Sequence, residues 1–233
     1  MDVATGQSTR QIGGDHSTEP PPERRKRGRP ATASADDVLR LATEQYLDGQ
    51  RVDITVVARQ LGLGRATIYR WFGSREQLLG EVIARELEKL AAHKRAQVRR
   101  RGAVGLLEVF DRVNRALARS TALRRLLEQE RDSAMRLLTS SGAVVEPRAV
   151  ACIEALINEE VSAGTYVPLI DPATLAYALV HLRHAFLLND ATTNVRGDHA
   201  RLREVQAALL GVPRPKPRAA GTPARRARRS PGS

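Results

Sequence analysis

The stretch that decides the fold is VDITVVARQLGLGRATIYRWFGSREQLL, residues 52–79. In its first half, apolar residues recur at helical spacing as far as Leu61, and the glycine after it is a helix-ending residue. A second short helix follows, in which Ile68 and Phe72 face inward while hydroxyl, aromatic and guanidinium groups face outward. Ser74–Gln77 has the pattern of a capping box, which opens a longer helix. Two short helices joined by a glycine turn predict a helix-turn-helix.

The run GLGRATIYRWFGSREQLL, residues 62–79, resembles the signature of TetR-type transcriptional regulators, and the likeness covers residues 34–90. Three positions depart from the family pattern: Gly64 stands where a capping serine is usual, Trp71 replaces a histidine, and Arg75 replaces a lysine. Residues 70–75 and the overall pattern also resemble the QsdR-like subgroup. The resemblance implies a homodimeric regulator that binds a double-stranded DNA operator and an unknown small-molecule effector.

Composition is consistent with an all-α fold. The chain has 233 residues, of which 42% are hydrophobic but only 3% aromatic, so Leu, Val, Ala and Ile must form the core. We expect a disordered basic arm over 1–33, a helix-turn-helix domain over 34–80, a helical effector-binding and dimerisation domain over 81–212, and a disordered basic tail over 213–233. The formal charge of +12 divides as +2, +3 and +7 among 1–33, 34–212 and 213–233. Most of the excess charge therefore lies in the tails.

Helical periodicity predicts the elements around the motif. We expect one helix over 34–49, one from Arg75 to about Arg99, and at least five more within 105–212. Among these, one runs unbroken through Leu123–Leu138, and another has Pro147 at its first position. The best dimerisation candidates are the helices 147–163 and 172–189, the second of which is apolar nearly all round.

The outward groups of the motif are candidate DNA contacts. Arg65 is the best candidate for a base edge, because arginine pairs with guanine through two hydrogen bonds, and Ala66 suits a thymine methyl group. Arg70 suits either a base or a phosphate. The expected phosphate contacts, which set register without reading sequence, are Thr55, Thr67, Tyr69, Trp71 and Arg75. The alternative for Tyr69 and Trp71 is packing within the motif.

The basic arm contains Arg27-Gly28-Arg29-Pro30, which resembles the core of an AT-hook. An extended arm of this kind places Arg27 and Arg29 in a narrow, A/T-rich minor groove. The alternative is a solvated basic leader that attracts phosphates without sequence preference.

For an effector, the sequence offers a polar stripe on an apolar helix, formed by Tyr177, His181 and His184. The alternative is that neutral histidines line an interface. We expect no metal, because no Cys or carboxylate near in sequence completes a ligand set, and no cofactor.

Other classes of protein lack support in the sequence. The chain has no nucleophile elbow, glycine-rich phosphate loop or metal-ligand spacing, so we expect no enzyme. One cysteine, Cys152, and the lack of a signal peptide or membrane span favour a cytoplasmic, nucleoid-associated protein with no membrane partner.

The sequence thus predicts a dimeric ligand-responsive transcriptional regulator, in most of the family a repressor, that binds a palindromic operator and is released by its effector. Two alternatives remain open. One is an architectural protein that coats DNA through its basic tails without sequence preference. The other is a ligand-binding module whose helix-turn-helix no longer binds DNA.

Overall fold

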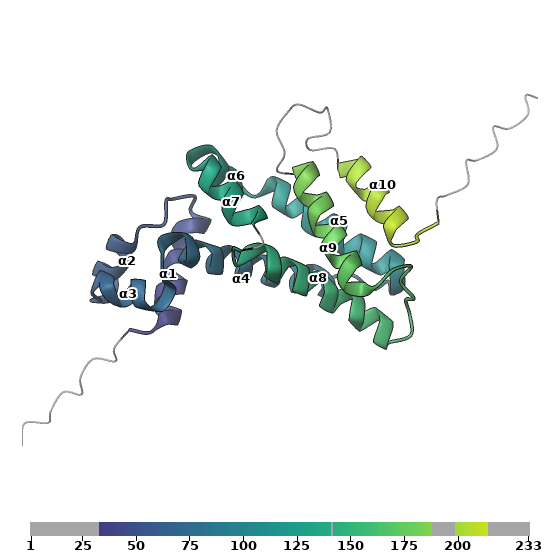
Figure 1. The fold of residues 1–233 in the computed structure, drawn as a ribbon, viewed down its shortest axis with the longest axis horizontal. Coiled ribbons are helices and arrows are strands. Elements are labelled where there is room, and N and C mark those ends of the chain that lie inside the picture. Colours follow the sequence, from purple (N-terminus) through teal and green to yellow (C-terminus); the bar gives the residue numbers. More distant parts are fainter. Residues whose placement is uncertain (1–32, 141, 188–198, 214–233) are drawn as a thin grey trace, which may run out of the picture. The chain divides into compact units, whose positions relative to one another are not determined.

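The described residues, 33–140, 142–187 and 199–213 of a computed structural model, form helices and no strand (Figure 1). This confirms the all-α prediction. The helices are α1 (Ala35–Leu47), α2 (Ile54–Leu61), α3 (Arg65–Phe72), α4 (Arg75–Ala96), α5 (Gly102–Arg119), α6 (Thr121–Gln129), α7 (Arg131–Thr139), α8 (Val145–Ser162), α9 (Pro172–Leu187) and α10 (His199–Leu209).

Local capping fixes the ends of the first four helices. Ser34 and Asp37 form a reciprocal capping box at α1, and the Asp53 side chain accepts from the backbone of the first turn of α2. Gly62 ends α2 in the left-handed region, with φ of 63°, which glycine adopts without strain. Ser74 caps α4 by accepting from the backbone N–H of Gln77. The expected helix-turn-helix is therefore present as α2, a three-residue turn and α3.

Three predicted elements differ from the structure. The helix expected to run through Leu123–Leu138 breaks at Glu130, whose φ of −139° and ψ of 46° are not helical, into α6 and α7. Pro147 is the third residue of α8, not the first; a proline is still tolerated there because N–H groups of the first turn have no helical partner. The fourth helix ends at Ala96 instead of Arg99. The predicted disorder of 1–33 and 213–233 falls almost wholly outside the described residues.

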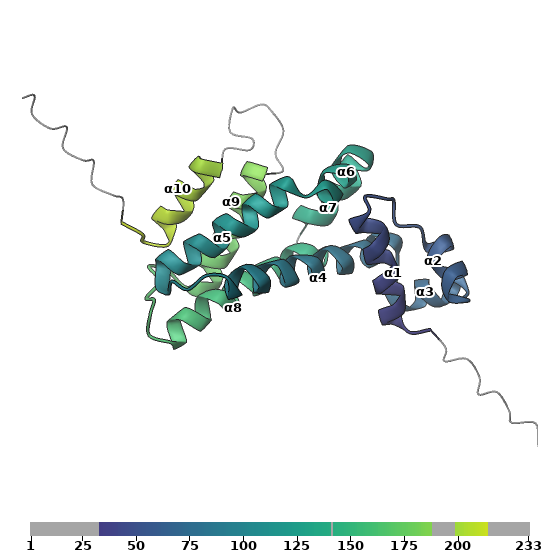
Figure 2. The same ribbon diagram turned by 180° about the vertical axis from the view of Figure 1, so that it is seen from behind.

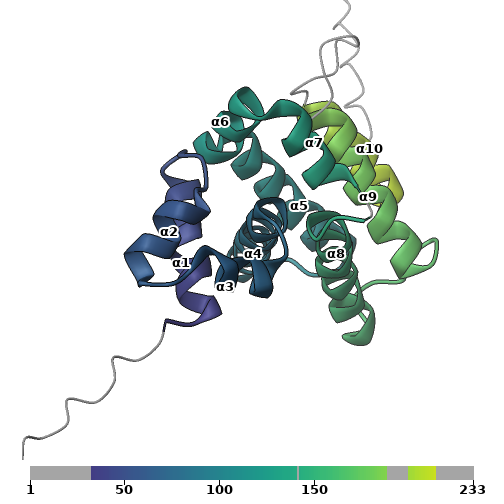
Figure 3. The same cartoon turned by 60° about the vertical axis from the view of Figure 1, so that its left-hand side comes forward.

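Apolar side chains bury two clusters. The first joins α1–α3 and the start of α4 to α6, α7 and the start of α8, and the second joins the rest of α4 to α5, α8, α9 and α10. Helix α4 contributes to both, through Leu78, Leu79 and Val82 in the first and Leu87 and Ala91 in the second. Figures 2 and 3 show α4 extending from beside α1–α3 to a position alongside α5 and α8.

The first cluster crosses the predicted boundary between residues 80 and 81. Ala122, Leu126 and Leu137 belong to α6 and α7, yet they pack with Tyr46 and Leu79 of the N-terminal part. The division into two domains stays a prediction, and their shared core favours cooperative behaviour. None of the described helices is long and apolar enough to cross a membrane.

Substitution of Ile68 tests whether α3 depends on the first cluster. Ile68 is fully buried, so Ile68→Ala removes packed methyl groups and leaves a cavity. We expect the free energy of unfolding to fall by about 2–5 kcal/mol, measured by chemical denaturation. Val104→Ala is the control: Val104 lies on α5 and is 39% exposed, and its truncation should change stability by less than about 0.5 kcal/mol. Equal effects of the two substitutions would contradict the packing.

Candidate DNA-binding surface and ligand cavity

Helix α3 presents most of the predicted DNA contacts to solvent. Ile68 points into the core, while Tyr69 and Trp71 are 39% and 36% exposed, so packing inside the motif does not bury them. The other exposed predicted contacts are Thr55, Arg65, Ala66 and Arg70, and Thr67 is half-buried. The structure thus brings seven of the eight residues predicted within the motif to an accessible surface of α2 and α3. Arg27 and Arg29 lie outside the described residues.

The start of α3 is open to a close approach. Gly64 is the N-cap and provides no side-chain hydrogen bond, so backbone N–H groups of the first turn are left without a capping partner. A Cβ at this position would meet nothing nearer than the Thr67 hydroxyl at 4.0 Å. The Arg65 guanidinium lies over the Tyr69 ring at 5.9 Å from its centroid, a distance at which a cation–π contact orients the arginine.

Arg75 is placed differently from the other predicted contacts, because each of its three guanidinium nitrogens already donates a hydrogen bond inside the protein. Its Nε donates to the Val52 carbonyl at 2.7 Å, and its two terminal nitrogens donate to the Glu130 carboxylate at 2.7 and 2.6 Å. Both side chains are about one-seventh exposed, at 14% and 15%. The Arg75 hydrogen bonds hold the pKa of Glu130 below its usual value against the opposing effect of burial. This pair joins the start of α4 to the break between α6 and α7.

A cavity of about 690 Å³ lies among the helices that surround α4. Its wall is mostly apolar and includes residues of α1, α4, α5, α6 and the start of α8. The apolar lining residues are Leu47, Ile83, Leu87, Leu90, Ala116, Leu117, Ala118, Leu123, Leu127, Leu138 and Val145. A volume of this size, with an apolar wall, is typical of a site for a small organic ligand.

Two polar side chains of α9, Arg183 and His184, line the cavity. Arg183 is 7% exposed, and among the described residues no carboxylate pairs with its guanidinium. Burial lowers its pKa to about 10, which still leaves it charged at neutral pH. Burial, followed by the nearby charges of Arg183 and His181, lowers the pKa of His184 to about 3, so this ring is neutral. The α9 wall of the cavity therefore presents one cation and one neutral imidazole, while the other charged lining residues, Glu86, Arg124, Glu128 and Arg131, come from α4, α6 and α7.

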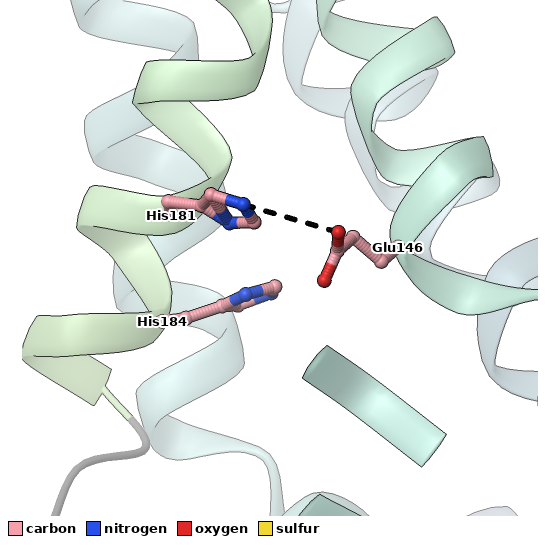
Figure 4. A group of neighbouring side chains, drawn as sticks. All are labelled: Glu146, His181 and His184. Atoms are coloured by element: carbon pink, nitrogen blue, oxygen red, sulfur yellow. Dashed lines mark ion pairs between the residues drawn. The ribbon is translucent and has the colours of Figure 1, made fainter. Parts of the chain in front are cut away.

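Only part of the predicted effector stripe reaches the cavity. His184 lines it, whereas Tyr177, which is 52% exposed, and His181 are not among its described lining residues. The centroid of the His181 ring instead lies 3.9 Å from the centroid of the Tyr177 ring. The His181 ring also faces Glu146 of α8 (Figure 4). The role of all three in effector binding stays a prediction.

Sequence reasoning missed three residues that the structure brings to these sites: Glu130, Glu146 and Arg183. Arg183 carried a signal, since it interrupts the most apolar helix of the chain. The two glutamates had none, because their partners Arg75 and His181 lie 55 and 35 positions away.

A helix-turn-helix with an exposed second helix, joined by one long helix to a bundle that encloses an apolar cavity, defines the class of DNA-binding transcriptional regulators that carry their own ligand-binding region. The comparisons with known proteins name the family. A family model described as the tetracyclin repressor-like C-terminal domain matches residues 101–211. The solved structure of the R. erythropolis transcriptional repressor QsdR, of the TetR family, is 30% identical, with a TM-score of 0.70 over 79% of this chain and 97% of that one.

The chain therefore belongs to the TetR family of transcriptional regulators, and it is a regulator and not an enzyme. The TetR family repressor AlkX from Dietzia sp. strain DQ12-45-1b, implicated in biodegradation of n-alkanes, is 23% identical with a TM-score of 0.55, covering 77% of this chain and 96% of that one; it supports the fold alone. No curated protein matches the sequence.

Removal of the Glu130 carboxylate tests the link between α4 and the α6–α7 break. Glu130→Gln removes the closest charged partner of the largely buried Arg75 guanidinium, and also the carboxylate that lies 3.3 Å from Arg51 Nε, so we expect a loss of about 1–3 kcal/mol in the free energy of unfolding at pH 7. The folded pKa of Glu130 lies below its ordinary value of 4.5, so the pair stabilises the protein above that pH, and its contribution is lost as pH falls through the folded pKa.

Denaturation at pH 7 and at pH values below 4.5 measures both effects. The stability difference between wild type and Glu130→Gln should shrink at the acid end. Glu128→Gln, at an exposed position two residues away, is the matched control and should have little effect. A Glu130 effect that persists unchanged in acid would show that its cause is not the ion pair.

Proposed function

We propose that the protein is a dimeric, ligand-responsive repressor that binds a palindromic operator through α3 and leaves it when a small molecule fills the cavity. The observation that carries the proposal is the position of α4, whose first turns pack under α3 and whose middle lines the cavity. The transcriptional repressor QsdR, which is 30% identical to this chain, supports the direction of regulation.

The proposed DNA contacts follow from side-chain chemistry on the exposed surface of α3. Arg65, in its first turn, reads a base edge in the major groove, and Ala66 beside it contacts a thymine methyl group. Thr55, Thr67, Tyr69 and Trp71 bind phosphates and fix the register, and Arg70 takes either role. The open backbone at Gly64 accepts a phosphate at the start of α3.

Arg75 has a changed role in this proposal. A guanidinium with three hydrogen bonds inside the protein has little capacity left for a phosphate, so we propose that it positions α4 against the α6–α7 break. Its contribution to DNA binding is then indirect.

Dimerisation is proposed to use α8 and α9. Five of the exposed large apolar side chains fall on these helices or on the loop between them, and such exposure on a soluble surface is a sign of a partner. They are Val161, Val167, Leu169, Ile170 and Tyr177. A dimer places two α3 helices on half-sites about 34–36 Å apart or a multiple of that spacing.

The effector is proposed to combine an apolar body with an anionic or strongly accepting group. The apolar wall of α4, α5 and α6 accommodates the body, and Arg183, a buried cation with no paired carboxylate among the described residues, binds the polar end. A ligand that favours one arrangement of α4 against α6 shifts the spacing of the two α3 helices, so operator affinity falls by differential binding to the two states.

Selection of bound sequences from random DNA at physiological salt tests the DNA-binding proposal. We expect a palindrome with two half-sites. Arg65→Ala should lose about 1–3 kcal/mol on that operator and relax one base position, because a bidentate base contact is removed. Tyr69→Phe should weaken operator and random DNA alike, since it removes a phosphate contact.

The same selection with residues 34–212 alone separates this proposal from tail-driven coating of DNA. Under coating, loss of both basic tails abolishes binding and no sequence is enriched. Under the present proposal the shortened chain still selects the palindrome, with lower affinity.

Binding of a fluorescent fatty acid probes the cavity. Arg183→Met keeps the volume of the side chain roughly constant and removes the charge, so affinity should fall about tenfold or more, as expected for loss of a hydrogen bond to a charged group worth about 1.5–3 kcal/mol. The matched fluorescent alcohol, which has no charge, should bind both proteins equally. A fatty acid whose affinity is unchanged by the substitution would exclude Arg183 as the anion-binding group.

A further inference from the structure

Three potential metal-binding side chains converge where α8 meets α9. His181 and His184 lie one turn apart on α9, and Glu146 lies in the first turn of α8. One ligand atom from each of the three lies within 4.8 Å of the other two. Figure 4 shows both imidazole rings directed toward the Glu146 carboxylate.

The Glu146 carboxylate is buried without adequate partners. Its residue is only 4% exposed, and among the described residues its Oε2 accepts no hydrogen bond. The other oxygen, Oε1, lies 3.9 Å from His181 Nε2, which is too long for a hydrogen bond. A buried carboxylate with an unpaired oxygen is costly, so its presence points to a cation that neutralises it.

We propose that Glu146, His181 and His184 bind a divalent transition-metal ion of the zinc type. Two imidazoles and one carboxylate are a ligand set that zinc accepts, with metal–ligand distances of about 2.0–2.2 Å. In a tetrahedral site with these distances, the ligand atoms lie roughly 3.3 Å apart. The ligand atoms here lie within 4.8 Å of one another, so their largest separation must shorten by at most about 1.5 Å. Small rotations of the three side chains supply this movement. Sequence spacing alone hid the site, because the carboxylate comes from another helix.

The site would have an open position toward the cavity. Three protein ligands leave the fourth position of a tetrahedral ion to water or to an oxygen of a bound molecule. His184 lines the cavity, as does Val145, the neighbour of Glu146. The charge of Arg183, beside His184, opposes cation binding, and the carboxylate of Glu146 offsets it. An occupied site would therefore add a net positive charge beside Arg183 at the α9 wall of the cavity.

Metal titration of the full-length protein, after treatment with a chelator and dialysis, tests the proposal. Calorimetry with Zn²⁺ should give one ion per chain with micromolar or tighter affinity, and Co²⁺ should give the visible absorption bands of a low-symmetry four-coordinate site. Glu146→Gln and His184→Gln each remove one ligand, so each should weaken Zn²⁺ binding by more than about tenfold. A tenfold loss is already the lower limit when a residue that only hydrogen-bonds to a metal ligand is changed.

His93→Gln is the matched control, because His93 lies on α4, outside the cluster, and contacts Gln97. It should leave the affinity and the Co²⁺ spectrum unchanged. Circular dichroism and thermal unfolding establish that each variant is folded. Absence of saturable Zn²⁺ binding, or binding equally tight in Glu146→Gln, His184→Gln and wild type, would overturn the proposal. Neither result depends on the DNA-binding proposal, so the two stand or fall separately.

Discussion

The architecture depends on the burial of one helix, α4, in two apolar clusters. Its first half packs with α1–α3, α6 and α7, and its second half packs with α5, α8 and α9. Protein interiors are close-packed and resist gradual deformation. A displacement of α4 against either cluster therefore switches the side chains from one packing arrangement to another. The same constraint explains how α4, whose amphipathic character is weak, is stabilised as a helix: α1, α3, α5, α7 and α8 pack against it. Helix α4 is therefore one route by which the cavity can influence α3.

The Arg75–Glu130 ion pair sits where that influence is transmitted. A largely buried pair is weak support for stability, because desolvation offsets most of its attraction, but it fixes one register between two elements. Glu130 takes a non-helical conformation between α6 and α7, and this break directs its carboxylate to the start of α4. Helix α6 also supplies Leu123 and Leu127 to the cavity wall. One short helix thus touches both the ligand space and the base of the DNA-binding motif.

Features set by local chemistry could be predicted from the sequence, and features set by distant contacts could not. The glycine turn at Gly62, the Ser34 cap and the outward face of α3 follow from neighbours within four residues. The break at Glu130 was missed because the helical period continues across it, and the partner of its side chain, Arg75, lies 55 positions away. Glu146 was missed for the same reason: helical periodicity relates residues on one helix and says nothing of which other helix faces it. The cavity likewise depends on seven helices that no local pattern relates.

An apolar cavity at the junction of the two clusters has a thermodynamic consequence. Its apolar lining side chains are withdrawn from water when a molecule that fits occupies the space, and burial of this apolar surface favours binding. Such a ligand stabilises the folded chain in proportion to the logarithm of its concentration, whatever its effect on DNA. Release of DNA requires more: the ligand must prefer one arrangement of α4 and α6 over the other, since equal affinity for both shifts no population. Arg183 and His184, the polar groups at the α9 wall, fix the orientation of such a ligand through hydrogen bonds. A ligand held in one orientation contacts α4 and α6 differently in the two arrangements, and it therefore binds one of them more tightly.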